Sequence, residues 1–512
     1  MASAITSLTM IGSILLVGAI HGALVLPTHP PMGVNSFDLQ YDRKQNSSVP
    51  VWNETTYRRV ATAMASQLLP HGYDTMVIDG GWSANFVDGN GRPIPDPLQW
   101  PSSANGAGFK PLADWTHSLG LKFGIWTLRG VNPIAAERRL PVLGADPPVT
   151  IDRIVYDSSR CSTDPATVRW CNCTWDSQGV GIDAAHPAAQ SYYNSVVDQY
   201  AAWGVDFIKW DCMYDDGMAV ASYSREEVLA ANAVRRTRRP IVLSLSPGGG
   251  MTTDAAAWVA GVKGGHAPSP ASGGTFRQQA SMYRVTGDFH SRPLQWIDGL
   301  GEHAFVVGNL TERGLIGVNS TWPDLDIMDL GRYSGYFGTG AAQLHAVMWM
   351  MARSPLMYGG AMPIEDPVTL RLVTNKLALM VNRYSDNLNV TYSGDCRCHL
   401  SRIHGNACRP LNDPMSKQDP CVVTWWSNLN ACRAVAVMNV GNASGADVDV
   451  SFKQIGIPPA SPGAPYTVAR VYEERSEKAL SSVAVSVQAL SGTLLLISPH
   501  GTDPADCANV QQ

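Results

Sequence analysis

The segment FIKWDC (207–212) is one of the short apolar runs that decide the fold of this chain. Seven further runs occur along residues 31–360, and each can precede a loop and a segment with helical spacing. Continuous apolar runs that alternate with helices are typical of parallel strands covered on both faces, so eight units predict a (β/α)8 TIM barrel. The runs are PMGVNSF (31–37), TMVIDGGW (75–82), KFGIWTL (122–128), FIKWDC, IVLSLSP (241–247), MYRVTGD (282–288), TWPDLDIM (321–328) and SPLMYGG (354–360).

Two helices between these runs can be placed from the sequence. Pro187 can begin one at its first turn, apolar residues follow at three- and four-residue spacing, and Gly204 ends it. The other covers residues 341–353. The stretch between the third and fourth runs is far longer than one helix requires, so it is either a loop at the barrel mouth or a surface insertion.

After about residue 385 the apolar pattern changes to period two, which predicts an antiparallel β-sandwich. The expected strands are VVTWWSNL, CRAVAVMNV, ADVDVSF, YTVARVYEE, SVAVSVQAL and GTLLLIS. We therefore expect a catalytic barrel over residues 27–382 and a C-terminal sandwich over 385–500.

The amino terminus has the pattern of a secretory signal peptide, which we place at residues 1–23. An uncleaved membrane anchor is the alternative, since no charged residue precedes Asp38. The 10 cysteines form one group of four and one of six, which fits two separately disulfide-bonded domains, and seven N-glycosylation sequons are present. These features predict a disulfide-bonded glycoprotein of the secretory pathway, extracellular, in the cell wall, or in a vacuole or lysosome.

Composition excludes several classes of function. With 38 basic and 43 acidic residues the net charge is −5, so there is no general basic surface for nucleic acid. GLGEHA (299–304) lacks the strand and the final glycine of a dinucleotide-binding motif, and neither HExxH nor GxSxG occurs. CRCH (396–399) is half of a zinc motif at most.

Carboxylates lie at or near the carboxyl ends of four predicted strands, which meet at one face of a barrel. They are Asp79, Asp211, Asp288 and the pair Asp324 and Asp326. Each alone could cap the following helix. Strand alternation puts Lys209 and Asp211 on one face and Cys212 on the other, and it puts Arg284, Thr286 and Asp288 on one face.

Two inward carboxylates, each beside a cation, are the groups that a glycosidase uses: one attacks or activates water, and the other protonates the leaving oxygen. Several tryptophans in or beside the strands can contact the apolar faces of sugars, although most tryptophans of a chain this size belong to the core. They are Trp82, Trp126, Trp210 and Trp322.

Seven ordered motifs resemble the strand motifs of glycoside hydrolase family 27, the α-galactosidase or melibiase family, and most of all its plant-type branch. They are PPMG (30–33), VIDGGW (77–82), GLKFGIW (120–126), GVDFIKWDC (204–212), YRVTGD (283–288), WPDLDIM (322–328) and SPLMYGG, so the resemblance covers residues 30–382. The resemblance implies a retaining glycosidase of carbohydrate metabolism that removes terminal α-D-galactosyl residues. It also implies that the enzyme needs no cofactor and no metal. The oligomeric state stays open.

The resemblance also assigns roles to residues. Asp211 matches the family's nucleophile and Asp288 its acid/base, about 5 to 5.5 Å apart in a retaining enzyme. Residues expected to bind the sugar are Asp79, Lys209, Arg284, Asp326, Trp126 and Ser246. Cys212 matches a disulfide position, and Cys173 is the expected partner.

Departures from the family pattern concern the substrate. Gly80 stands where a second Asp is common, and Val34 where a Trp is common, so a ligand for the hydroxymethyl side of galactose can be missing. That keeps β-L-arabinopyranose, which lacks this group, as an alternative. Small residues at Ser246 and Gly249 keep α-N-acetylgalactosamine as another. A different class, a catalytically silent sugar-binding protein, would require loss of a carboxylate.

Overall fold

The computed structural model describes most of the chain. The described residues are 24–40, 51–83, 86–156, 171–173, 175–213, 226–246, 279–289, 293–312, 321–331, 334–392, 420–441 and 444–508. The predicted signal peptide (1–23), the CRCH segment (396–399) and Gly249 lie outside them.

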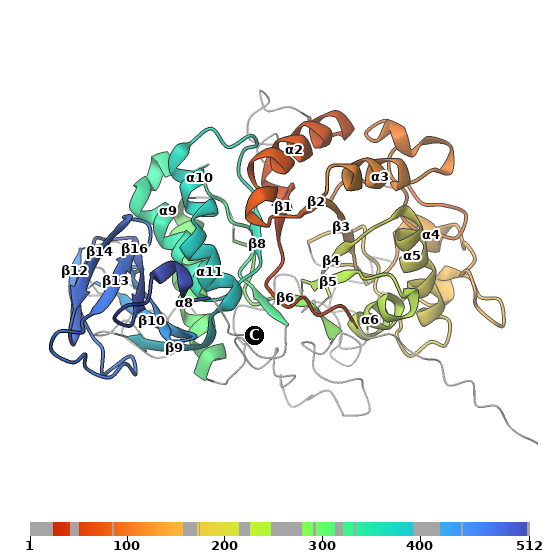
Figure 1. The fold of residues 1–512 in the computed structure, drawn as a ribbon. Coiled ribbons are helices and arrows are strands. Elements are labelled where there is room, and N and C mark those ends of the chain that lie inside the picture. The colour runs from red at the N-terminus through yellow and green to blue at the C-terminus, as the bar shows by residue number, and fades with distance from the viewer. Residues whose placement is uncertain are drawn as a thin grey trace, which may run out of the picture.

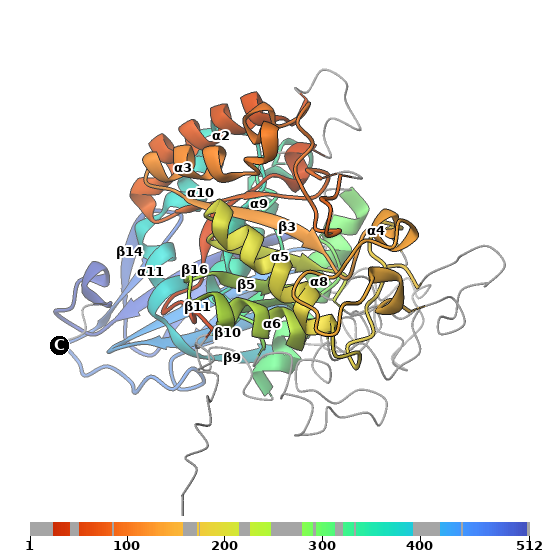
Figure 2. The ribbon, with the colours of Figure 1, turned by 90° about the vertical axis from the view of Figure 1, so that its right-hand side faces the viewer.

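Eight parallel strands form one curled sheet in the order β7-β6-β5-β4-β3-β2-β1-β8. The backbone N–H groups of Met328 and Gly359 donate across the β7–β8 edge, to Met357 O at 2.7 Å and to Met328 O at 3.1 Å, and close the sheet into a barrel. Figure 2 shows the helices α5 (Ala189–Trp203) and α6 (Glu226–Thr237) packed side by side on the outside of the sheet. The predicted barrel is confirmed. Its strands are β1 (Met32–Asn35), β2 (Thr75–Ile78), β3 (Lys122–Leu128), β4 (Phe207–Asp211), β5 (Val242–Leu245), β6 (Met282–Arg284), β7 (Trp322–Asp324) and β8 (Leu356–Tyr358).

Helices cover the outside of the barrel (Figure 1). They are α2 (Glu54–Gln67), α3 (Lys110–Ser118), α4 (Pro133–Glu137), α5 (Ala189–Trp203), α6 (Glu226–Thr237), α8 (Pro293–Glu312), α9 (Ser334–Met351), α10 (Pro367–Thr374) and α11 (Lys376–Tyr384). The helix predicted after Pro187 is α5, and it ends at Gly204, whose φ of 90° is a left-handed cap that favours glycine. The GLGEHA segment lies inside α8, as part of a helix.

The C-terminal part contains a six-stranded antiparallel sheet, β14-β13-β16-β11-β10-β9, and a two-stranded sheet, β12-β15. Valines and isoleucines from both sheets share one buried cluster, so the predicted sandwich is confirmed. The period-two pattern missed β9 and β14. The strands are β9 (Asp386–Tyr392), β10 (Val422–Leu429), β11 (Cys432–Asn439), β12 (Ala446–Ser451), β13 (Tyr466–Arg470), β14 (Arg475–Ala479), β15 (Ser482–Val487) and β16 (Ser491–Ser498).

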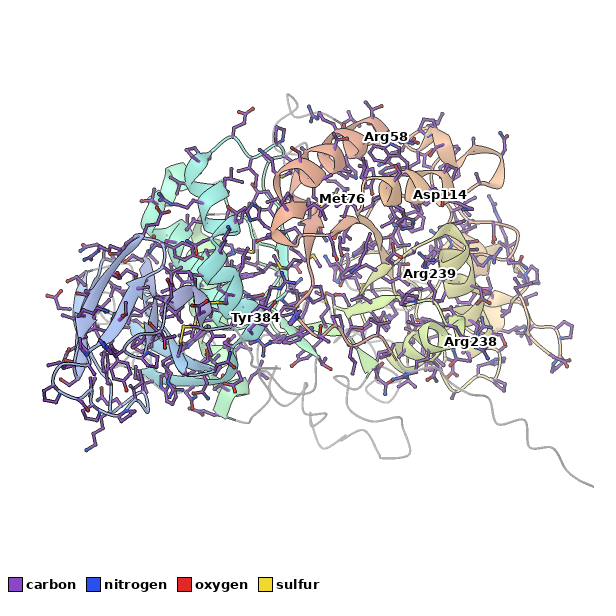
Figure 3. All side chains as sticks on the ribbon, viewed as in Figure 1. Arg58, Met76, Asp114, Arg238, Arg239 and Tyr384 are labelled. Carbon is purple, nitrogen blue, oxygen red and sulfur yellow. A yellow bond between two sulfur atoms is a disulfide. The ribbon has the colours of Figure 1, made fainter. Side chains whose placement is uncertain are left out.

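The barrel and the larger C-terminal sheet share a continuous hydrophobic core. Helix α9 packs on β16 and β11, and Gln343 Nε2 donates to Gly492 O at 2.8 Å across this contact. Figure 3 shows side chains filling the space between the two parts, with Met76 of β2 in the interior and Arg58 and Asp114 at the surface. Among the helices of the described residues, none has the length and apolar character needed to cross a membrane.

Candidate active site

A cavity of about 540 Å³ opens at the carboxyl ends of the barrel strands. Its polar lining includes the side chains that follow or end β2, β4, β6 and β7, because parallel strands deliver these positions to one face of the barrel. Most of the predicted site residues meet there: Asp79, Trp126, Lys209, Asp211, Arg284, Asp288 and Asp326.

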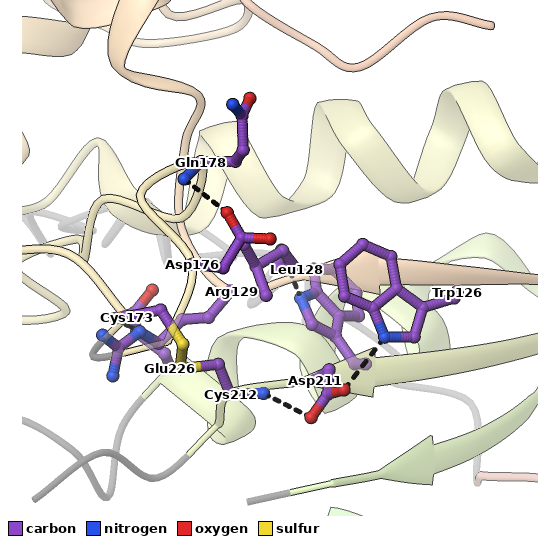
Figure 4. The surroundings of a disulfide bond; sticks show 10 residues. Trp126, Leu128, Arg129, Cys173, Asp176, Gln178, Asp211, Cys212 and Glu226 are labelled. Atoms are coloured by element: carbon purple, nitrogen blue, oxygen red, sulfur yellow. Dashed lines mark hydrogen bonds and ion pairs between the residues drawn. A yellow bond between two sulfur atoms is a disulfide. The ribbon is translucent and has the colours of Figure 1, made fainter. Parts of the chain in front are cut away.

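Asp211 ends β4 and is held by two donors. Trp126 Nε1 of β3 donates to its Oδ2 at 2.9 Å, and the Cys212 backbone N–H donates to its Oδ1 at 2.8 Å (Figure 4). Burial raises the pKa of Asp211, Lys209 opposes that shift, and the charge of Asp288 adds to it. Both carboxylate oxygens are therefore fixed in direction.

Lys209 lies two residues before Asp211 and faces the same cavity, as strand alternation predicts. Its ammonium group donates to Asp79 Oδ2 at 3.0 Å, and Asn35 Nδ2 donates to the same oxygen at 2.9 Å. Although burial opposes the charged form, the nearby carboxylates, first of all Asp79, raise the pKa of Lys209. Lys209 thus stays an ammonium group, and it joins β4 to β2 at the cavity floor.

The Arg284 guanidinium group contacts three residues that follow β6 and β7: Asp326, Asp288 and Gly287. Its Nη2 lies 2.9 Å from Asp326 Oδ2 and 3.2 Å from Asp288 Oδ1, and it donates to Gly287 O at 2.5 Å. The Arg284 side chain is only 3% exposed, whereas that of Asp288 is 60% exposed. Asp288 is therefore anchored on one side and open to solvent and ligand on the other.

Asp326 has a backbone conformation that few residues other than glycine adopt. Its φ of 78° lies in the left-handed region, where Asp is tolerated better than most side chains. The Phe289 N–H donates to Asp326 Oδ2 at 2.7 Å, and Trp349 Nε1 of α9 donates to the Asp326 carbonyl at 2.9 Å. These contacts hold the strained residue in place.

Two residues singled out from the sequence lie elsewhere. Thr286 does not face the cavity with Arg284 and Asp288: its hydroxyl lies 3.0 Å from His303 Nε2, because β6 ends at Arg284 and strand alternation ends with it. Asp324 is buried and accepts from the Asp326 N–H at 2.8 Å, and burial raises its pKa to about 6. Of the Asp324 and Asp326 pair, only Asp326 lines the cavity.

Ser246 is buried beside the nucleophile strand and is not one of the lining residues. The Ser246 side chain lowers the pKa of the Asp211 carboxyl. Cys212 points away from the cavity and forms a disulfide with Cys173, the predicted pairing (Figure 4). Each of the two described disulfides joins members of one predicted cysteine group, since the second is Cys432–Cys507.

Gly80 brings β2 close to the Trp126 ring. A Cβ at residue 80 would lie 3.5 Å from two ring carbons, which is ordinary van der Waals contact. The cavity wall here is therefore an aromatic face where the family commonly has a carboxylate. Of the other tryptophans named above, Trp210 and Trp322 are buried core residues, and Trp82 is buried but reaches the lining.

Several lining residues were missed by sequence reasoning: Phe37, Phe86, Arg129, Asn132, Trp175 and Gln178. Phe37 could have been found, since it ends the first predicted strand run. Phe86 and Trp175 lie on long loops, where no periodicity indicates which way a side chain points. In the described parts of the chain, no group of three or more His, Cys, Asp or Glu is arranged to hold a metal ion.

Comparisons with known proteins agree with this geometry. A family model described as alpha galactosidase A matches residues 27–136. An α-galactosidase of Cyamopsis tetragonoloba is 23% identical over 430 residues, which cover 82% of this chain and 78% of that protein. The crystal structure of a family 27 β-L-arabinopyranosidase from Geobacillus stearothermophilus is 26% identical, with a TM-score of 0.71 over 93% of this chain and 98% of that one.

These findings make the chain similar to the enzymes of glycoside hydrolase family 27 over most of its length. A putative α-N-acetylgalactosaminidase from Bacillus halodurans is also similar, at 25% identity and a TM-score of 0.67, over 93% of this chain and all of that one. The family 27 relatives are glycosidases, and this chain is one as well. Their substrates differ, so the similarity to family 27 does not identify the sugar that this chain cleaves.

Proposed function

We propose that this enzyme is a retaining glycosidase that removes terminal α-D-galactosyl residues from oligosaccharides or glycoconjugates. The observation that carries the proposal is the unequal pair of carboxyl groups in one cavity. Asp211 is fixed by Trp126 and by a backbone N–H, whereas Asp288 is held by Arg284 on one side and is 60% exposed on the other.

In the proposed mechanism the Asp211 carboxylate attacks the anomeric carbon and forms a glycosyl ester, while Asp288 gives its proton to the leaving oxygen. Asp288 then takes a proton from water, and that water cleaves the ester with overall retention. Asp79, Lys209, Arg284 and Asp326 are placed to bind sugar hydroxyls. The Trp126 ring offers an apolar face to the sugar as well as a donor to Asp211.

A β-L-arabinopyranosidase is the second candidate, and Gly80 is the observation that favours it. No side chain at this position can hydrogen-bond the 6-hydroxyl of galactose, and the sugar of the alternative substrate has no such group. The similarity to the Geobacillus stearothermophilus β-L-arabinopyranosidase supports the same candidate.

The cell compartment and the domain limits are also proposals. Disulfides persist in oxidising compartments, so Cys173–Cys212 and Cys432–Cys507 support passage through the secretory pathway. A barrel domain over 27–382 and a sandwich over 385–500 accord with the change from parallel to antiparallel strands between β8 and β9.

The proposed function is tested with nitrophenyl α-galactoside, β-L-arabinopyranoside and α-N-acetylgalactosaminide at equal concentration. We expect the highest kcat/KM on the α-galactoside and loss of turnover in Asp211→Asn, with the fold retained by circular dichroism. Asp114→Asn, on the surface of α3, is the matched control. Preference for the arabinopyranoside would select the second candidate. Cleavage of none of the three would favour a silent sugar-binding protein.

A further inference from the structure

The segment that carries Asp288 is anchored on both sides of this residue. Two residues earlier, the Thr286 side chain is buried, and its hydroxyl lies 3.0 Å from His303 Nε2 of α8. One residue later, the buried Phe289 donates its N–H to Asp326 Oδ2 at 2.7 Å. The side chain of Asp288 is 60% exposed, so Asp288 is the open residue between two buried neighbours.

His303 connects this segment to the one that follows β7. The residue is only 1% exposed, and its Nε2 lies 2.8 Å from the Leu325 carbonyl oxygen as well as beside the Thr286 hydroxyl. Its Nδ1 lies 2.5 Å from the Gly299 carbonyl oxygen in the preceding turn of α8. One imidazole ring therefore contacts both segments, each within two residues of a carboxylate that lines the cavity.

Ring packing holds Phe289, the residue after the proposed acid/base. Gly299 makes room for it, because a Cβ at residue 299 would lie 2.9 Å from Phe289 Cδ2. Close packing of this kind leaves a side chain little freedom to move, so the backbone on this side of the acid/base is fixed as well. Three rings meet the Phe289 ring edge-on, at centroid distances of 4.9 to 5.3 Å: His303, His345 and Trp349.

The His303 ring is neutral near neutral pH. Burial lowers its pKa to about 4, although the Gly299 and Leu325 carbonyls oppose that shift, and the charge of Arg284 lowers the pKa further. His303 is not one of the cavity-lining residues, so a substrate does not touch it. A neutral ring that lies behind the cavity can influence the reaction only through the residues that it holds, which are Thr286 and Leu325.

The hydrogen-bonding atoms are what a histidine adds at this place. An apolar ring of similar size would pack among the same aromatic side chains and would avoid the cost of burying polar atoms. The Thr286 hydroxyl and the Leu325 carbonyl would then lose this contact, and the two segments would no longer be joined through residue 303.

We propose that His303 is a positioning residue for proton transfer: by holding Thr286 and Leu325, it keeps Asp288 within reach of the leaving oxygen. The proposal rests on the proposed function, because it takes Asp288 as the acid/base. An acid displaced by about 1 Å protonates the leaving oxygen poorly, while Asp211 keeps its own donors from Trp126 and Cys212. The loss should therefore fall on substrates whose leaving group needs a proton.

The test compares methyl α-galactoside, whose leaving group needs protonation, with nitrophenyl α-galactoside, whose leaving group needs little. His303→Phe keeps an aromatic ring and removes both nitrogens. We expect it to lower kcat/KM about tenfold or more on the methyl glycoside and less than about twofold on the nitrophenyl glycoside. His303→Gln keeps a donor and an acceptor and should retain most of the activity on both.

Thr286→Val tests the same contact from its other end and keeps the proposal testable if His303→Phe does not fold. It should change the ratio of the two activities in the same direction, and the double variant should add little to either single one. Thr116→Val is the matched control. Thr116 is a buried residue of α3 whose hydroxyl lies 2.8 Å from Tyr57 Oη, and it does not line the cavity, so only stability should change.

Two outcomes would overturn the proposal and leave the proposed function intact. One is an equal loss on both glycosides with a lower temperature of unfolding, which would make His303 a structural residue. The other is an unchanged ratio in His303→Phe and Thr286→Val while Asp288→Asn still loses activity selectively on the methyl glycoside. If Asp288→Asn shows no selective loss, the acid role of Asp288 fails and the proposal fails with it. If only the sugar differs, the corresponding β-L-arabinopyranosides replace the pair.

Discussion

Asp211 and Asp288 have different surroundings, and the proposed mechanism requires that difference. A nucleophile must be ionised and held in line with the anomeric carbon, which the donors from Trp126 and Cys212 provide. An acid/base must exchange protons with the leaving group and with water, which the exposed side of Asp288 permits. Burial and the charge of Asp288 raise the pKa of Asp211, so the two groups are electrostatically coupled.

The first prediction concerns Asp288→Asn. On poor leaving groups we expect kcat/KM to fall about 10²- to 10⁴-fold, and much less on nitrophenyl glycosides, which need little protonation. The basic limb of the pH profile should be lost, because it reports deprotonation of the acid group that the variant lacks. The acid limb reports protonation of Asp211, whose pKa burial raises, and it should remain. Rates on both leaving groups across pH give the two readouts. Equal loss on both leaving groups, or a basic limb that is retained in the variant, would contradict the assignment.

The second prediction concerns Gly80→Asp, which supplies the carboxylate common in the family. The added Cβ meets only ordinary contact with Trp126, and the backbone φ of Gly80 is not in the left-handed region, so the fold should tolerate it. We expect the ratio of kcat/KM for the α-galactoside to that for the β-L-arabinopyranoside to rise about tenfold through a hydrogen bond to the 6-hydroxyl. Gly80→Ala fills the same space without the charge and is the control. A ratio unchanged from that control would show that the carboxylate does not reach the hydroxymethyl group.

Sequence patterns located the reactive residues because strand ends are easy to find. Asp79, Asp211 and Asp326 lie at or near the carboxyl ends of predicted strands, and all three line the cavity. Thr286 was placed wrongly, since period-two reasoning holds only while the chain is extended and β6 ends two residues earlier. Trp175 could not be placed, because disulfide and loop contacts far apart in sequence set its direction.

At the scale of elements, the Cys173–Cys212 disulfide joins the Trp175 turn to β4. The third prediction is that Cys173→Ala with Cys212→Ala lowers stability, with about 4 kcal/mol expected from loop entropy over a separation of 39 residues. It should also reduce kcat/KM on the disaccharide α-1,6-linked galactosyl-glucose more than on methyl α-galactoside, because the turn that places Trp175 in the cavity lining loses its anchor. Thermal unfolding and the glycoside pair measure the two effects.

The Cys432–Cys507 disulfide provides the matched control for that experiment. It spans 75 residues in the C-terminal part and does not touch the cavity. Its removal should cost stability but leave the ratio of activities on the two glycosides unchanged. A similar change of ratio in both double variants would mean that lost stability, and not the position of the turn, explains the effect.

Element types were predictable from periodicity, and element ends were not. All eight barrel runs contain a strand, but β6, β7 and β8 have only three residues each, because the chain leaves the sheet where the site begins. Strand β14, RSEKA, is polar on both faces and lies at the edge of its sheet, so it has no apolar alternation to detect. Its pairing with β13 comes from the hairpin and not from burial.

At the scale of the whole molecule, helix α9 contacts both the barrel and the C-terminal sandwich. Trp349 on this helix donates to the Asp326 carbonyl, while Leu344 and Gln343 contact Gly492 of β16. The shared core that results predicts that the barrel and the sandwich unfold together. Neither the sequence motifs nor the domain limits indicated this coupling, because it depends on contacts between residues about 150 positions apart.

The fourth prediction tests that coupling with Leu344→Ala. Leu344 is fully buried, so the truncation should cost about 2–5 kcal/mol and lower the temperature of one common calorimetric transition. Leu98→Ala is the control, because Leu98 is 89% exposed and should change stability by less than about 0.5 kcal/mol. Two separate transitions, of which only one moves, would show independent domains.

The position of α9 also limits how family members can exchange parts. A chimera that takes its C-terminal sandwich from a relative would present a different β16 surface to Leu344 and Gln343. Any shift of the helix would move Trp349, which donates a hydrogen bond to the Asp326 carbonyl. Asp326 already has a backbone conformation that few residues adopt, so it would tolerate such a shift poorly. Successful recombination should therefore need a crossover point before residue 334, so that the helix and the sandwich are inherited together.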